Sequence, residues 1–158
     1  MKAFSFFLII TIIFIIALIS MNSGALRFFN TNPNLVFAFI AGLIALRVKN
    51  SIVCSLLFLL LLLAFLFFPF WIVEYSLLCG VGFISLFARS KLTGNSISDV
   101  FILSSVGSLL FSLCLWFFSH SSIDIYQIVL QVVYNSICGV ILVLILKPLI
   151  KRGGISQL

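Results

Sequence analysis

Long apolar runs separated by short polar segments dominate this chain and leave no room for a water-soluble domain. Of its 158 residues, 64% are hydrophobic and 8% are charged, whereas a soluble globular domain carries about 25% charged residues. A chain this apolar cannot cover its own surface with polar groups in water. Since each membrane crossing needs about 20 apolar residues, the sequence predicts an all-α polytopic membrane protein. We expect a bundle of about six transmembrane helices that forms one transmembrane domain over residues 1–158.

Six apolar runs define the expected helices. They cover residues 3–20, 35–46, 52–73, 75–88, 100–119 and 125–150. The first run is longer and bulkier than the apolar core of a signal peptide, which favours a retained span over a cleaved leader. The second and fourth runs are short, so we expect them to tilt or to pack deeply against their neighbours. A five-span chain with its N-terminus outside is the alternative topology.

Basic residues gather in alternate connections of this map. Eight of the nine basic residues fall on one side, and only Arg27 falls on the other. The positive-inside rule makes the first side cytoplasmic, so both termini are expected there, in a multi-pass protein of the cytoplasmic (inner) membrane. An aromatic belt is expected at the other interface, formed by Trp71, Tyr75, Trp116 and Tyr126. The net charge of +6 is therefore assigned to topology and membrane lipids, not to nucleic acid.

Residues that carry chemistry are sparse. No charged residue lies in the middle of a span, which argues against an ion-coupled transporter because intramembrane charges mark ion pathways. His120 lies four residues before Asp124, but no nucleophile elbow accompanies this pair. The four cysteines form no C-x-x-C pair. The sequence therefore predicts a non-enzyme with no catalytic residue, no cofactor and no metal site.

Polar and small side chains recur at helical spacing and mark the faces where helices meet. They are Gln127, Gln131, Asn135 and the nearby Gly139 in the last span, Ser104, Ser108, Ser112 and the nearby Gly107 in the fifth, Ala38 and Gly42 in the second, and Ser76 and Gly80 in the fourth. Small residues let helix backbones approach closely, and amides in hydrocarbon need hydrogen-bond partners. Two interpretations stay open at this point: packing within the bundle, or a seam for a separate membrane protein.

The order of these segments resembles the rod-shape-determining protein MreD family. The resemblance covers most of the chain and rests on three places. They are the segment Asn32–Leu35 that opens the second span, the basic turn Arg47–Lys49 followed by a Leu-rich span and a short span ending at Ala88–Arg89, and a last helix in which Asn135 precedes an apolar run with the basic end Lys147–Arg152. Many family members carry a Gly and an Asp late in the third span, whereas residues 60–69 have neither.

The resemblance implies a non-catalytic scaffold subunit of the bacterial cell-elongation machinery, which directs peptidoglycan synthesis and rod shape. Its implied partners are an MreC-like scaffold, a RodA-like glycosyltransferase, a penicillin-binding protein and an MreB-like filament. The chain is also similar in size and helix number to the substrate-binding subunits of energy-coupling-factor vitamin transporters. That alternative predicts a pocket for a small molecule at the outer end, with candidate residues Trp71, Glu74, Tyr75, Trp116 and His120.

Overall fold

Helices account for nearly all of the residues that the computed structural model describes, which are 2–23, 31, 33–67, 71–119 and 124–153. No β-strand occurs among these residues. The elements are α1 (Lys2–Ser23), α2 (Leu35–Ala45), α3 (Asn50–Phe67), α4 (Ile72–Ala88), the 3₁₀ helix η2 (Arg89–Lys91), α5 (Ser96–Ser119) and α6 (Ile125–Gly153). The expected all-α class is therefore confirmed for the described part of the chain.

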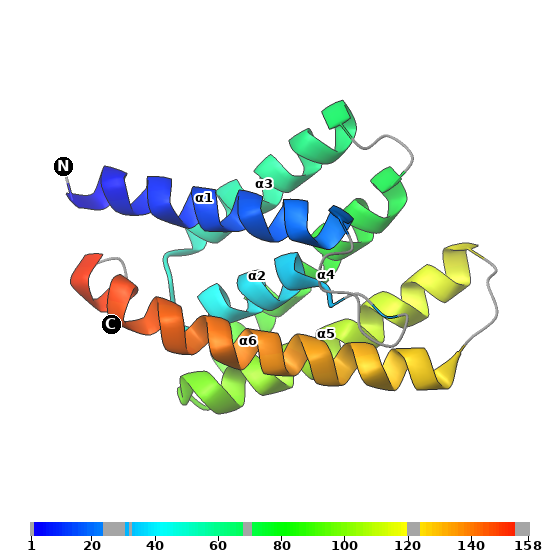
Figure 1. The fold of residues 1–158 in the computed structure, drawn as a ribbon. Coiled ribbons are helices and arrows are strands. Elements are labelled where there is room, and N and C mark those ends of the chain that lie inside the picture. The colour runs from blue at the N-terminus through cyan, green and yellow to red at the C-terminus, as the bar shows by residue number, and fades with distance from the viewer. Residues whose placement is uncertain (1, 24–30, 32, 68–70, 120–123, 154–158) are drawn as a thin grey trace.

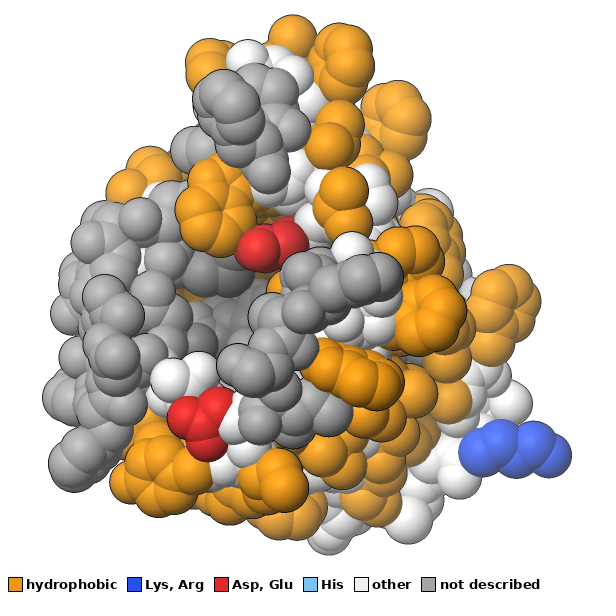
Figure 2. Space-filling view, turned by 90° about the vertical axis from the view of Figure 1, so that its right-hand side faces the viewer, with side chains coloured by type: hydrophobic (Ala, Val, Ile, Leu, Met, Phe, Trp, Pro, Cys, Tyr) orange, Lys and Arg blue, Asp and Glu red, His pale blue; other side chains and the backbone are white. Residues whose placement is uncertain are grey.

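Successive helices run in opposite directions, so α1 begins and α6 ends at the same end of the bundle (Figure 1). We call it the basic end, after its described basic residues Arg47, Lys49, Arg89, Lys91, Lys147 and Lys151. At the opposite end, Glu74 lies in the first turn of α4, and Asp124 accepts a hydrogen bond from the Tyr126 N–H at the start of α6. Figure 2 shows this second end, where acidic side chains lie among hydrophobic ones. The helix arrangement thus separates most of the negative charge from the positive charge.

Helix α2 lies at the centre of the bundle. It contacts each of the other five α-helices, and 10 of its 11 residues are buried. At a rise of about 1.5 Å per residue, 11 residues extend roughly 16 Å, about half of a bilayer hydrocarbon core. The apolar run 35–46 is therefore a buried core helix that is too short to cross a membrane. Its residues are apolar on all sides because protein covers every face.

Four helical segments are long and apolar enough to cross a membrane: α3, α4 extended through η2 to Lys91, α5 and α6. The described side chains of α1 contribute a shorter apolar helix, Phe7–Ser20. The predicted third span, 52–73, ran too far, because α3 ends at Phe67 and α4 begins at Ile72. Residues 68–70, which include Pro69, lie outside the described residues. Glu74 is consequently a first-turn residue of α4 and not a connection.

The connection between η2 and α5 is held by Asp99, in the first turn of α5. Its carboxylate accepts hydrogen bonds from the Thr93 N–H at 2.9 Å, the Thr93 hydroxyl at 2.7 Å and the Gly94 N–H at 3.0 Å. Gly94 has a φ of 86°, a backbone conformation that glycine adopts without steric cost. Asp99, the acidic residue near the basic end, is 1% exposed. Its carboxylate is therefore occupied by hydrogen bonds within this turn.

Candidate functional site

A buried polar cluster joins α2, α5 and α6, and we call it the Asn135 cluster, formed by Asn34, Ser108 and Asn135. The Asn135 Oδ1 accepts a hydrogen bond from the Asn34 N–H at 2.6 Å, and its Nδ2 donates to the Ser108 Oγ at 2.8 Å. Asn34 is also the N-cap of α2, because its Oδ1 accepts the Phe37 N–H at 3.0 Å. All three residues are at most 6% exposed. The cluster thus supplies partners for polar groups at the buried start of α2, which water does not reach.

Glycines allow close helix contacts around this cluster, between α5 and α2 at Gly107 and between α6 and α5 at Gly139. A Cβ at Gly107 of α5 would lie 2.0 Å from the Phe37 ring, and one at Gly139 of α6 would lie 2.9 Å from the Ser104 Oγ. Gly42 faces Val143, where a Cβ would meet ordinary contact at 3.5 Å. Larger side chains at Gly107 and Gly139 would therefore separate the helices, as expected for small residues at tight crossings.

The structure places most of the predicted site residues in this internal interface. Residues with buried side chains or backbones here are Ala38, Gly42, Ser104, Gly107, Ser108, Asn135 and Gly139. Ser112 and Gln131 are half-buried and bonded to each other, with the Ser112 Oγ donating to the Gln131 Oε1 at 3.2 Å. Gln127, one turn farther along, is exposed. The buried side chains among them face helices of this chain, and Ser112 and Gln131 are partly covered by each other.

Small residues do reach the surface on α4. Ser76 and Gly80 are exposed, and a Cβ at Gly80 would meet no atom within 4 Å. Bulky exposed residues lie on the same face: Val73, Ile84 and Phe87 have exposed fractions of 55%, 57% and 83%. We call these five residues the α4 outward face. Of the two small-residue pairs in the short predicted spans, Ala38–Gly42 is used inside the bundle and Ser76–Gly80 is not.

Arg47 ends α2 in a conformation that arginine rarely adopts. Its φ of 54° lies in the left-handed region, which glycine or asparagine usually occupies after a helix. The Arg47 N–H donates to the Ile44 carbonyl at 3.0 Å and the Val48 N–H to the Leu43 carbonyl at 3.1 Å, which is the Schellman arrangement. An arginine at this position keeps a strained backbone, and such strain tends to persist where a side chain has a function.

Replacing Arg47 by glycine is therefore expected to stabilise the fold by about 1 kcal/mol, since glycine removes the left-handed strain. Arg47→Ala is the matched variant, because it removes the same guanidinium and keeps a Cβ in the left-handed region. Thermal unfolding in detergent, followed by the monodisperse fraction after heating, would compare the two. Equal midpoints for the glycine and alanine variants would contradict the strain.

Two features of the site had no clear signal in the sequence. The partner of Asn135 is the backbone of Asn34, 101 residues away, and only the fold brings the two together. Arg89 donates from Nη1 to the Val48 carbonyl at 2.7 Å and to the Asn50 side chain. The sequence predicted only that Arg47 and Arg89 lie on the same side of the membrane, and it gave no sign that Arg89 bonds to the segment that follows α2.

The candidate residues of the small-molecule alternative differ in exposure. Tyr75 is 2% exposed, whereas Trp71 and Trp116 are 51% and 43% exposed; Glu74 is half-buried. His120 lies outside the described residues. Within the described parts, no three His, Cys, Asp or Glu side chains are grouped so that they could hold a metal ion.

Comparison with known proteins adds no family to this geometry. No protein-family model matches the chain, and neither the curated proteins nor the solved structures gave a match.

Proposed function

We propose that this chain is a non-catalytic membrane subunit that binds a transmembrane helix of a partner protein on the α4 outward face. The observation that carries the proposal is the pair Ser76–Gly80, exposed between the bulky residues Val73 and Ile84. Small residues four apart let a second helix approach the backbone closely, and bulky residues on either side supply van der Waals contact. In lipid, where apolar surface gives no hydrophobic drive, such packing is a main source of helix association.

An apolar groove continues from this face toward α5. It encloses about 230 Å³, and Ile84 and Ala88 of α4 and Ile102, Val106 and Leu110 of α5 line it together with residues of the connecting turn. Ile84 belongs to both the groove and the α4 outward face. A partner helix seated on Gly80 would therefore find a second contact along α5, which favours one docking orientation over a free rotation about α4.

The resemblance to the MreD family suggests the membrane, the machinery and the partners for this proposed subunit. The chain would insert with its basic end in the cytoplasm of the inner membrane and serve as a scaffold in the cell-elongation machinery, with MreC-like and RodA-like proteins as partners. The positive-inside rule supports this orientation, since the six basic residues that define the basic end lie together there. The filled centre around α2 supports a structural role, because the polar groups of the Asn135 cluster satisfy one another.

The test is co-purification from the native host. The tagged chain is extracted in mild detergent, and the membrane proteins retained with it are quantified by mass spectrometry. Gly80→Leu fills the open space on α4, so we expect recovery of the partner to fall at least tenfold, a loss of about 1.4 kcal/mol. Ser55→Leu is the matched control, because Ser55 is also small and exposed but lies on α3.

Recovery of MreC-like or RodA-like proteins that Gly80→Leu abolishes and Ser55→Leu retains would support the proposal in full. A partner retained equally by both variants would remove the α4 outward face from the proposal. Recovery of ATPase subunits with a transmembrane coupler would overturn the scaffold and favour the vitamin-transporter alternative.

A further inference from the structure

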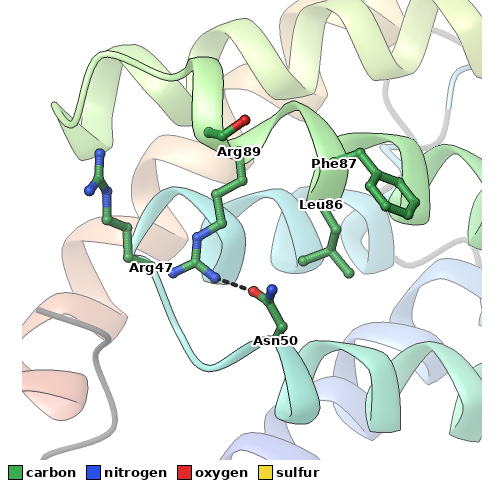
Figure 3. Close-up of a pocket in the computed structure, with 6 residues that line it drawn as sticks. Arg47, Asn50, Leu86, Phe87 and Arg89 are labelled. Atoms are coloured by element: carbon green, nitrogen blue, oxygen red, sulfur yellow. Dashed lines mark hydrogen bonds between the residues drawn. The ribbon is translucent and has the colours of Figure 1, made fainter.

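A polar cavity opens at the basic end, between the turn that follows α2 and the end of α4. It encloses about 350 Å³ and is lined by Arg47, Asn50, Leu86, Phe87, Arg89 and Ser90. Figure 3 shows the Arg89 side chain, from η2, directed at Asn50, and the Arg47 side chain extending from the α2–α3 connection in a different direction. The volume falls in the range of ligand pockets, about 300–1,000 Å³.

The charges around this cavity are unbalanced. Two arginines line it, and no acidic residue does. Of the three acidic residues in the sequence, Glu74 and Asp124 begin helices at the opposite end, and Asp99 is held by Thr93 and Gly94. The chain therefore brings two arginines together without supplying a counter-charge, and an anion from outside is the group that completes the site.

The donors available in the cavity suit a phosphate group. Arg89 makes both of its hydrogen bonds to described residues with Nη1, so Nε and Nη2 remain to be donated. These bonds to Val48 and Asn50 also fix the guanidinium in place. Arg47 is held at the rim by its left-handed backbone, and its guanidinium lies beside the Gly94 turn. Planar, pre-positioned guanidinium groups bind phosphate oxygens in pairs.

The apolar part of the lining distinguishes this cavity from a site for a bare ion. Leu86 and Phe87 of α4 contribute hydrocarbon walls next to the two arginines, and Phe87 is 83% exposed toward the surroundings of the bundle. A ligand with a phosphate and an adjacent apolar chain would satisfy both kinds of wall. Anionic phospholipids have this chemistry, and basic pockets between membrane helices bind such headgroups.

We infer that the cavity between Arg47 and Arg89 is a phosphate-binding site, and that its ligand is the headgroup phosphate of an anionic phospholipid or, failing that, a soluble phosphate. The excess positive charge disfavours a headgroup that carries its own cation, so phosphatidylglycerol should bind better than phosphatidylcholine of the same chain length. The cavity shares Phe87 with the α4 outward face, but the inference rests on Arg47 and Arg89, which do not belong to that face.

The experiment measures lipid retention by native mass spectrometry of the delipidated chain, titrated with phosphatidylglycerol or phosphatidylcholine. For the double variant Arg47→Asn/Arg89→Gln, we expect phosphatidylglycerol affinity to fall at least tenfold. Asparagine tolerates the left-handed backbone at residue 47, so this change keeps the turn. The control is Lys49→Gln/Lys91→Gln, which removes two charges from the same end at residues that do not line the cavity and should change the affinity less than twofold.

A second arm identifies the source of the phosphate and covers a variant that folds poorly. The thermal midpoint of the unaltered chain is measured in inorganic phosphate and in chloride at equal ionic strength. Selective phosphatidylglycerol binding without a shift in phosphate assigns the site to lipid, and a saturable shift without lipid selectivity assigns it to a soluble phosphate. Equal binding of both lipids with no shift in phosphate, or equal losses in the two double variants, would overturn the inference.

Discussion

Replacing Asn135 by leucine is expected to lower the stability of the folded chain by about 3 kcal/mol. Leucine cannot accept the Asn34 N–H, so a buried donor at the start of α2 would lose its partner, which costs about 1–3 kcal/mol. The branched side chain must also occupy the space of a 2.6 Å hydrogen bond, which adds the cost of overpacking. For a chain of this length the thermal midpoint should fall by about 6–12 °C.

The matched control is Gln127→Leu, two helical turns away on the same face of α6. Gln127 is exposed, so we expect its midpoint to stay within about 1–2 °C of the unaltered chain. Thermal unfolding in detergent measures both variants. If the Asn135→Leu variant has the same thermal midpoint as the Gln127→Leu variant and the unaltered chain, the hydrogen bond from the Asn34 N–H to Asn135 does not stabilise the start of α2.

Gly107→Ala is the second large effect, and it should destabilise the chain by about 2 kcal/mol or more. The added Cβ would lie 2.0 Å from the Phe37 ring, and Phe37 is itself 2% exposed, so the ring has little room to move. Overpacking of this kind costs about 3 kcal/mol, whereas alanine gains about 1 kcal/mol over glycine in helix propensity. The contact therefore outweighs the propensity.

Gly80→Ala is the control that measures the gain in helix propensity without the cost of overpacking. Gly80 also lies inside a helix, but its Cβ would meet no atom within 4 Å, so only the propensity gain of up to about 1 kcal/mol remains. We expect the midpoint to stay unchanged or rise for Gly80→Ala and to fall for Gly107→Ala. A rise in both variants would mean that α5 does not approach Phe37 closely.

The sequence predicted the features of the fold that depend on local composition. Runs of apolar residues located all six helices, and α5 and α6 lie close to the ranges expected from the runs 100–119 and 125–150. Ser104 and Ser108 of the polar stripe on α5, and Asn135 of the polar stripe on α6, are buried where these helices meet. Such stripes are readable because a polar group in hydrocarbon needs a partner and side chains 3.6 residues apart share a face.

Other features depend on contacts between distant segments, and composition carries no record of them. The run 35–46 reads as a short span because burial by protein and burial by lipid select the same apolar residues. Burial by protein is shown only by contacts with distant segments, such as the hydrogen bond between Asn34 and Asn135. The predicted span 52–73 was too long for a related reason, since the apolar run in the sequence continues beyond Phe67, where α3 ends.

The position of α2 also has a consequence for the order of events during synthesis. An 11-residue helix is too short to partition into a bilayer as an independent segment, and Asn135, which accepts the Asn34 N–H, emerges 101 residues after Asn34. At about 5–20 residues per second, the ribosome needs roughly 5–20 s to cover that distance. For that interval the Asn34 N–H lacks its Asn135 partner, and chains released before α6 is made should be the ones that membrane proteases remove.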